Sequence, residues 1–328
     1  MLHRGLGLIE LLLTLSILSL LAALLLPALA RAQESARRAS CQNNLRQWGM
    51  VFKMYAGEAQ GGLWPPIQVY DPAYPDTLTG FSAGPRVSAV YPDYLSDPNL
   101  ALCPSSLAAG NPALRGQDGD LLLVERPALI DVSYGYLGFL FEKTDRALVD
   151  ASAFPALMLL EAILDVSLSL EGNLVNAQLA AALEALVEDN IHRVPNALNA
   201  QRAVDRDIVD VRRHPATGEP MGNGNTDTIF RLREGIERFT VIDPMRAGKG
   251  LAQSQIWVMF DHISTNGGVA RFNHVPGGAN VLYMDGHVDY VAYVHTAPGN
   301  AADSAVWNEP VSPSVGWMIG ELISRKPL

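Results

Sequence analysis

Cysteine is scarce in this 328-residue sequence, which contains only Cys41 and Cys103. Two cysteines are too few for a disulfide-built scaffold, and they lack the close CxxC spacing of zinc and redox sites. The sequence leaves two alternatives open for them: one disulfide, if the body lies in an oxidising compartment, or two buried thiols.

Basic residues are also in the minority, since 24 Lys and Arg stand against 34 Asp and Glu, a net charge of −10. Residues 1–56 hold six Lys and Arg against Glu10 and Glu34, which leaves 18 basic and 32 acidic residues, or −14, in the rest. Such a body lacks the clustered positive surface that a phosphate backbone requires. We therefore expect no nucleic-acid partner.

Sequence patterns of common enzymes are missing as well. The chain has no usable G-x-S-x-G, phosphate-loop, dinucleotide or HExxH pattern. We therefore expect no enzymatic activity, cofactor or metal. The 48% hydrophobic and 18% charged content is typical of a packed globular protein rather than a disordered one.

What the sequence does contain is one long apolar run near its start. Residues 11–30 carry no charge, and a helix of about 20 apolar residues can cross a hydrocarbon core of ~30 Å. Pro27 would at most kink this helix. Arg4 on the short leading side favours a cytoplasmic N-terminus, whereas the arginines within residues 31–38 weigh against it.

Glu10 stands at the front of this apolar run. A carboxylate costs on the order of 2.5–3.5 kcal/mol at mid-membrane and less near the interface. Neither an ordinary membrane anchor nor a secretory signal cleaved after Ala30-Arg31-Ala32 requires a carboxylate at this position. Since charges within membranes are usually paired, Glu10 predicts a partner.

The segment Arg4-Gly5-Leu6-Gly7-Leu8-Ile9-Glu10 resembles the start of type IV prepilins and pseudopilins. Their signature is a basic residue, Gly, an apolar residue, a variable residue, Leu-Ile-Glu and a long apolar helix; Leu6 and Gly7 replace the usual Phe and Thr or Ser. The resemblance implies that a membrane-embedded prepilin peptidase and methyltransferase cuts between Gly5 and Leu6 and methylates Leu6. It also implies that Glu10 pairs with the new ammonium group of a neighbouring subunit, which offsets the desolvation of both charges.

A C-terminal block, residues 272–288, reads FNHVPGGANVLYMDGHV. It resembles the H-X9-DG processing-associated motif of large prepilin-like proteins, with His274, Asp285 and Gly286 at the motif positions and ten residues instead of nine between His and Asp. Residues 40–49 and 102–106 are similar to the same branch of the family.

The Asp-Gly pair in this block also predicts a β-hairpin with a two-residue turn. Such a turn would pair Tyr283 with Val288 and place His287 and Asp289 on one face. An alternative reading is a catalytic or metal site formed by His274, Asp285, His287 and Asp289, with Asp261 and His262 as further ligands.

The remaining patterns predict an α+β, pilin-like fold. Past the membrane run, apolar residues recur at helical spacing and form a stripe that ends before Gly61 and Gly62. The residues of this stripe are Cys41, Leu45, Trp48, Phe52 and Tyr55. Strands are expected at 129–141, 255–260 and 280–294. We therefore expect a long N-terminal helix packed on an antiparallel sheet.

Between the strands we expect a helical insertion at about 145–200 that forms a surface subdomain. One helix is predicted within 176–190 and another within 154–170. Residues 221–227 are rich in oxygen ligands but lack the carboxylates of an EF-hand, so a plain loop is favoured over a calcium loop.

Together these patterns divide the chain into a leader at 1–5, a transmembrane and amphipathic helix at 6–58 and an extracytoplasmic body at 59–328. The resemblance implies a structural subunit of a type IV pilus-like or type II secretion pseudopilus-like assembly. It would span the inner membrane once, with its body in the periplasm or outside the cell, and contact other pilin-like subunits through the N-terminal helix. The alternative is an enzyme or metal-binding module on a prepilin-type anchor.

Overall fold

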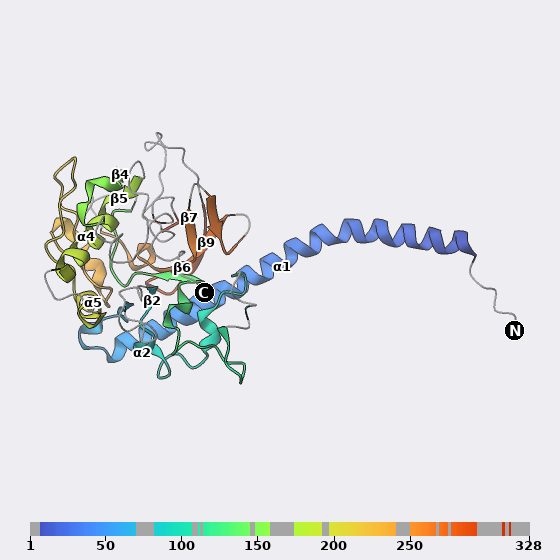
Figure 1. Cartoon of the computed structure of the whole chain (residues 1–328), viewed down its shortest axis with the longest axis horizontal. Coiled ribbons are helices and arrows are strands. Elements are labelled where there is room, and N and C mark those ends of the chain that lie inside the picture. The colour runs from blue at the N-terminus through green and yellow to red at the C-terminus, as the bar shows by residue number, and fades with distance from the viewer. Residues whose placement is uncertain are drawn as a thin grey trace.

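The computed structural model describes residues 7–69, 82–106, 111, 114–144, 148–157, 174–191, 197–240, 250–266, 269–274, 277–293, 310–311 and 315. In this part of the chain, one long helix extends from an α+β body with antiparallel sheets (Figure 1). The prediction of a long N-terminal helix packed on an antiparallel sheet is confirmed. Gly5 and Leu6, the expected cleavage point, lie outside the described residues.

Helix α1 spans Leu8–Glu58, a length of roughly 75 Å at 1.5 Å per residue. Residues 8–30 are mostly Leu and Ala, which favour helix, and Pro27 lies inside the helix without ending it. Residues 8–40, which we call the arm, are exposed apart from the half-buried Glu34 and Arg38. From Cys41 onward the helix packs into the body, as Figure 1 shows.

The body contains thirteen described strands and short helices besides its 3-10 turns: β1 (Ile67–Gln68), β2 (Ser82–Pro85), α2 (Val87–Val90), β3 (Tyr134–Tyr136), β4 (Leu148–Asp150), β5 (Leu174–Asn176), α4 (Ala177–Ile191), α5 (Ala197–Val204), β6 (Trp257–Asp261), β7 (Ile263–Asn266), β8 (Val269–Phe272), β9 (Gly278–Tyr283) and β10 (Val288–Ala292). The main sheet has the order β10-β9-β6-β3, and β1-β2, β4-β5 and β7-β8 form pairs. All described pairings are antiparallel.

Both faces of the main sheet are buried at β9, β6 and β3, whereas most residues of the edge strand β10 are partly or fully exposed. On β9, Leu282 belongs to the core against α1, whereas its neighbours Val281 and Tyr283 belong to the core on the opposite face. This alternation follows from the two-residue period of a strand. In β6 the pairing with β9 shifts between Trp257 and Met259, and such a bulge lets two consecutive side chains face the same core.

Aromatic rings fix the buried half of α1 to the sheet. The ring of Phe52 lies 5.5 Å from those of Trp48 and Trp64 and 4.9 Å from that of Tyr136 on β3, measured between centroids. At Gly49 the helix comes so close to β9 that an added Cβ would lie 3.2 Å from Leu282 Cδ1. The predicted apolar stripe of α1 is therefore its contact face.

The insertion is not the surface subdomain that the sequence led us to expect. Ala180, Ala181 and Ala182 of α4 are buried in the same core as Val281 of the main sheet. These side chains are small and apolar, so α4 can be enclosed in the body. The insertion thus covers the sheet face opposite α1, and it also includes the strand pair β4-β5. Residues 158–173, most of the second expected helix, lie outside the described residues.

The turn between β9 and β10 also differs from the expected two-residue turn. The backbone N–H of Tyr283 donates to His287 O at 3.0 Å, and this hydrogen bond encloses the three residues 284–286. Within the turn, the backbone N–H of Gly286 donates to Tyr283 O at 2.9 Å. Val288 consequently pairs with Leu282 rather than Tyr283. Gly286 has a positive φ of 94°, whereas a two-residue type I′ turn needs positive φ at both central positions. The slip of one residue moves Tyr283 and His287 to the same side, where their rings stack.

The loop at 221–227 binds a side chain of the protein itself. The ammonium group of the buried Lys143 donates to Pro220 O at 2.7 Å, Gly222 O at 2.9 Å and Asn225 Oδ1 at 3.4 Å. Two of these oxygens, those of Gly222 and Asn225, belong to the loop that we considered for calcium, and they bind a cation supplied by the chain.

Candidate functional site at the base of the arm

A disulfide joins Cys41 to Cys103 where the arm enters the body. The two Cα atoms are 5.4 Å apart, the two cysteines are 62 positions apart in sequence, and both side chains are fully buried. Cys41 belongs to α1, and Cys103 follows the 3-10 turn Pro98–Ala101. Of the two alternatives that the sequence left open, the structure has the disulfide.

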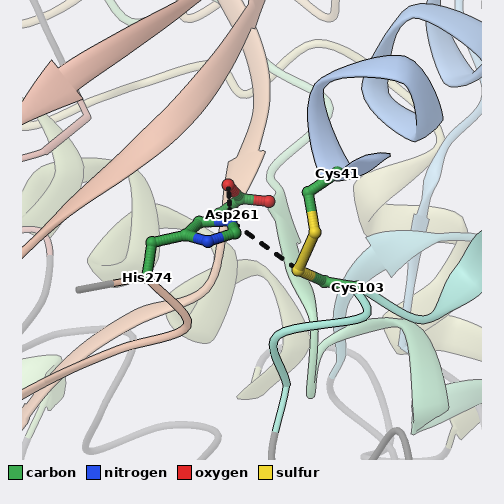
Figure 2. Close-up of side chains that lie close together, drawn as sticks. All are labelled: Cys41, Cys103, Asp261 and His274. Carbon is green, nitrogen blue, oxygen red and sulfur yellow. Dashed lines mark hydrogen bonds and ion pairs between the residues drawn. A yellow bond between two sulfur atoms is a disulfide. The ribbon is translucent and has the colours of Figure 1, made fainter. Parts of the chain in front are cut away.

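Next to the disulfide lies a fully buried histidine, His274 (Figure 2). Its Nε2 is 2.8 Å from Asp261 Oδ2 and 3.7 Å from Cys103 Sγ, and its Nδ1 is 3.1 Å from Glu34 Oε1. Glu34 belongs to the arm and Asp261 to β6. One imidazole therefore links the helix, the sheet and the disulfide-bonded loop.

The main sheet positions the Asp261 carboxylate. Asp261 is the last residue of β6, and Oδ2 accepts hydrogen bonds from Asn280 of β9, from the backbone N at 3.0 Å and from the side-chain Nδ2 at 2.5 Å. Asn280 Nδ2 also lies 3.3 Å from His274 Nε2. Because Asn280 sits in the segment that follows His274, the path of the chain into β9 brings the histidine onto β6.

Charge at this site favours the imidazolium form of His274. Burial of the ring works to lower its pKa, but the hydrogen bonds and negative charges of Asp261 and Glu34 outweigh burial, and the pKa of His274 lies above its ordinary value. Both ring nitrogens can then donate, one to each carboxylate. By contrast, burial lowers the pKa of His262, whose Nδ1 lies 2.8 Å from Asp131 O.

Two buried oxygen atoms at the site have no hydrogen-bond partner within the described part of the chain: Oδ1 of Asp261 and Oδ1 of Asn280. Buried polar atoms are normally hydrogen-bonded, because leaving one unpaired costs about 1–3 kcal/mol. The site thus has unused acceptor capacity beside the disulfide.

The other residues of the C-terminal motif lie elsewhere. Asp285 and Gly286 form the β9-β10 turn, five residues beyond Asn280, or on the order of 15 Å along the strand. There Asp285 Oδ1 is 2.5 Å from His287 Nδ1, and Asp289 Oδ2 is 3.6 Å from His287 Nε2. This cluster is solvent-accessible, so the alternative of one site made by His274, Asp285, His287 and Asp289 is wrong.

Comparison with models of protein families, curated proteins and solved structures finds no match for this chain. We therefore infer its function from the chain's own residues.

At the far end of the arm, Glu10 is exposed in the first turn of α1. Its Oε2 accepts a hydrogen bond from Gly7 N at 2.9 Å, so the carboxylate caps its own helix. A carboxylate can accept several donors, so this bond leaves capacity for another. By length and composition, α1 is also the one described helix that could cross a membrane.

Two residues of the site were not predicted from the sequence, Glu34 and Asn280. Glu34 precedes Cys41 by seven residues, which is about two helical turns, so the two share a helix face. That spacing is a usable signal for Glu34. Asn280 lies inside the motif block, but its role depends on the pairing of β9 with β6, which no local pattern indicates.

Proposed function

We propose that this chain is a structural subunit of a type IV pilus-like or type II secretion pseudopilus-like assembly. It is inserted in the inner membrane through the arm, cut after Gly5 by a prepilin peptidase, and methylated at Leu6. The observation that carries the proposal is the division of α1 into an exposed apolar half and a half packed on the sheet.

The exposed half needs apolar surroundings. Its large apolar side chains lie on every side of the helix: Leu8, Ile9, Leu11, Leu12, Leu13, Leu15, Ile17, Leu18, Leu20, Leu21, Leu24, Leu25, Leu26 and Leu29. Transfer of each such side chain from water to apolar surroundings contributes roughly 1.5–3 kcal/mol. A helix that is apolar all round suits a bilayer, and packing among sister helices would bury the same surface.

Glu10 places a negative charge at the start of this apolar segment, and an ordinary membrane anchor does not need such a charge. Cleavage after Gly5 would create an ammonium group at Leu6, four residues before Glu10, at the membrane end of each subunit. Pairing of Glu10 with the ammonium group of a sister molecule offsets the desolvation of both charges. The Glu10 carboxylate of one subunit then neutralises the N-terminal ammonium charge of its neighbour.

The disulfide supports a body outside the cytoplasm. Disulfides persist in oxidising compartments such as the periplasm and are rare in the reducing cytosol. Cys41 and Cys103 form a disulfide where the arm meets the body. The disulfide therefore favours a periplasmic or extracellular body and a cytoplasmic N-terminus.

The test replaces Glu10 with glutamine, which keeps the shape and removes the charge. In cells with prepilin peptidase and assembly machinery, we expect Glu10→Gln to be inserted and processed but to lose at least about tenfold in assembled subunits, since an unpaired ammonium group in the membrane costs more than about 1.4 kcal/mol. Assembly is measured as the fraction of subunit in sheared or crosslinked oligomers. Thr14→Ala, one turn further along and without a charge change, is the matched control. Wild-type assembly of Glu10→Gln would refute the pairing role.

A further inference from the structure

Four groups that commonly bind metal converge at the base of the arm. The Cys41 and Cys103 sulfurs, a carboxylate oxygen of Asp261 and a ring nitrogen of His274 lie within 4.8 Å of one another, and all four residues are buried. Figure 2 shows them approaching one point from α1, the loop at Cys103, β6 and the segment before β9. This set differs from the one considered from the sequence, because it includes both cysteines and excludes the hairpin residues.

We propose that reduction of the Cys41–Cys103 disulfide converts this cluster into a binding site for one Zn²⁺ ion. The ligands are the two thiolates, His274 Nε2 and the Asp261 carboxylate. Two sulfurs, one nitrogen and one oxygen complete a tetrahedral zinc site, and thiolate with imidazole favours zinc over calcium or magnesium. The disulfide-bonded form binds no zinc at this cluster, since its sulfurs are not thiolates.

One of the distances already present suits this geometry. Zinc bonds of roughly 2.0–2.3 Å in a tetrahedron put neighbouring ligand atoms about 3.3–3.8 Å apart. Cys103 Sγ lies 3.7 Å from His274 Nε2, within this range. Asp261 Oδ2 lies 2.8 Å from the same nitrogen, so the carboxylate has to move away from the ring by about 0.5 Å when the ion enters. On reduction the sulfurs lose their covalent bond and can separate to the required spacing by side-chain rotation.

The surrounding residues are those that a zinc site needs. Glu34 Oε1 at Nδ1 turns Nε2 of His274 toward the sulfurs, and a carboxylate behind a ligating histidine is a common feature of zinc sites. Asn280 donates to Oδ2 of Asp261. The other oxygen, Oδ1, is buried without a partner among the described residues, and a metal ion would satisfy it.

The chemistry balances with a phosphine as the reductant. The phosphine breaks the S–S bond, gives two thiols and becomes a phosphine oxide, taking its oxygen from water. Zn²⁺ then replaces the two thiol protons and the Nε2 proton of His274, which pass to solvent. The redox state of one cysteine pair thereby determines whether the ion is bound.

The test uses the full chain in detergent, reduced with phosphine and titrated anaerobically with Co²⁺ as a spectroscopic substitute for Zn²⁺. We expect saturation at one equivalent, the visible bands of tetrahedral cobalt and a thiolate-to-cobalt charge-transfer band, all removed by one equivalent of Zn²⁺. The oxidised chain should show none of these. No stoichiometric binding after reduction, binding that is equal in the oxidised chain, or a spectrum without the thiolate band would overturn the proposal.

Variants identify the ligands. Asp261→Ala and His274→Ala should each weaken Co²⁺ binding at least about tenfold, and Glu34→Gln, which changes a partly exposed positioning residue, by about tenfold. His287→Ala in the accessible hairpin cluster should bind as the wild type does. If the buried variants fail to fold, two measurements still test the proposed zinc site. They are the Co²⁺ affinity of Glu34→Gln and the difference in Co²⁺ binding between oxidised and reduced wild-type protein. An effect of His287→Ala equal to that of Glu34→Gln would contradict the assignment.

Discussion

Replacing Asp261 with alanine is expected to lower the free energy of unfolding of the disulfide-bonded chain by about 3–5 kcal/mol. The carboxylate is fully buried and pairs with His274 while accepting two hydrogen bonds from Asn280. Its removal leaves the buried His274 ring with one carboxylate instead of two, and leaves two amide donors of Asn280 without their acceptor. Denaturant unfolding of the full chain in detergent, with a metal chelator present, measures the loss.

Asp285→Ala is the matched control, because it removes the aspartate of a second Asp–His pair. The Asp285–His287 pair is solvent-accessible, with roughly a third of each side chain exposed, and accessible ion pairs contribute about 0–1 kcal/mol. Equal losses for Asp261→Ala and Asp285→Ala would contradict the expectation that burial strengthens the first pair.

Reduction of the Cys41–Cys103 disulfide in the presence of a chelator is expected to lower the free energy of unfolding by about 4 kcal/mol. The bond closes a loop between residues 62 positions apart, and the chain-entropy relation gives this magnitude for such a loop. The effect arises chiefly because the unfolded chain regains freedom. The measurement is the free energy of unfolding of oxidised and phosphine-reduced protein, each obtained from its own midpoint and slope, because a less constrained unfolded chain also changes the slope.

A double variant, Cys41→Ala with Cys103→Ala, is the control for this experiment. It should have the same midpoint with and without phosphine, near that of the reduced wild type. Two observations would exclude a stabilising disulfide. One is that wild-type protein never treated with reductant shows two free thiols to a thiol reagent after denaturation, and the other is that it unfolds at the same midpoint as the phosphine-treated protein.

The long helix could be predicted because its signals are local. The uncharged run at residues 11–30 and the repeating spacing from Cys41 to Tyr55 each lie within a few turns of one helix. Gly61 and Gly62, which mark its end, both have positive φ in the turn after α1. The strands β6, β9 and β10 could be predicted for the same reason, since alternation is also local.

The candidate site could be predicted only in part, because it is assembled from distant segments. His274 and Glu34 are 240 residues apart, and Cys103 and His274 are 171 apart. The motif block identified the histidine but grouped it with Asp285, its neighbour along the chain. Which acid reaches His274 depends on the pairing of β9 with β6, and this is set by packing of the whole sheet.

The burial of α4 and the β9-β10 turn were mispredicted for different physical reasons. The acidic residues of α4 suggested a surface, yet Glu184 is buried beside Arg212, with Nη1 3.3 Å from Oε1. In the turn, the Asp285 side chain accepts from His287 N at 3.1 Å. This hydrogen bond accompanies the three-residue turn, which an Asp-Gly pair permits as well as the shorter one.

The most direct test of the proposed function is the mass of the native N-terminus, determined on protein purified from membranes of cells that have a prepilin peptidase. We predict a mature chain that begins at Leu6 and carries one added methyl group. A chain that begins at Met1, as an ordinary anchor would, or at Gln33, as after signal-peptidase cleavage, would contradict the proposal.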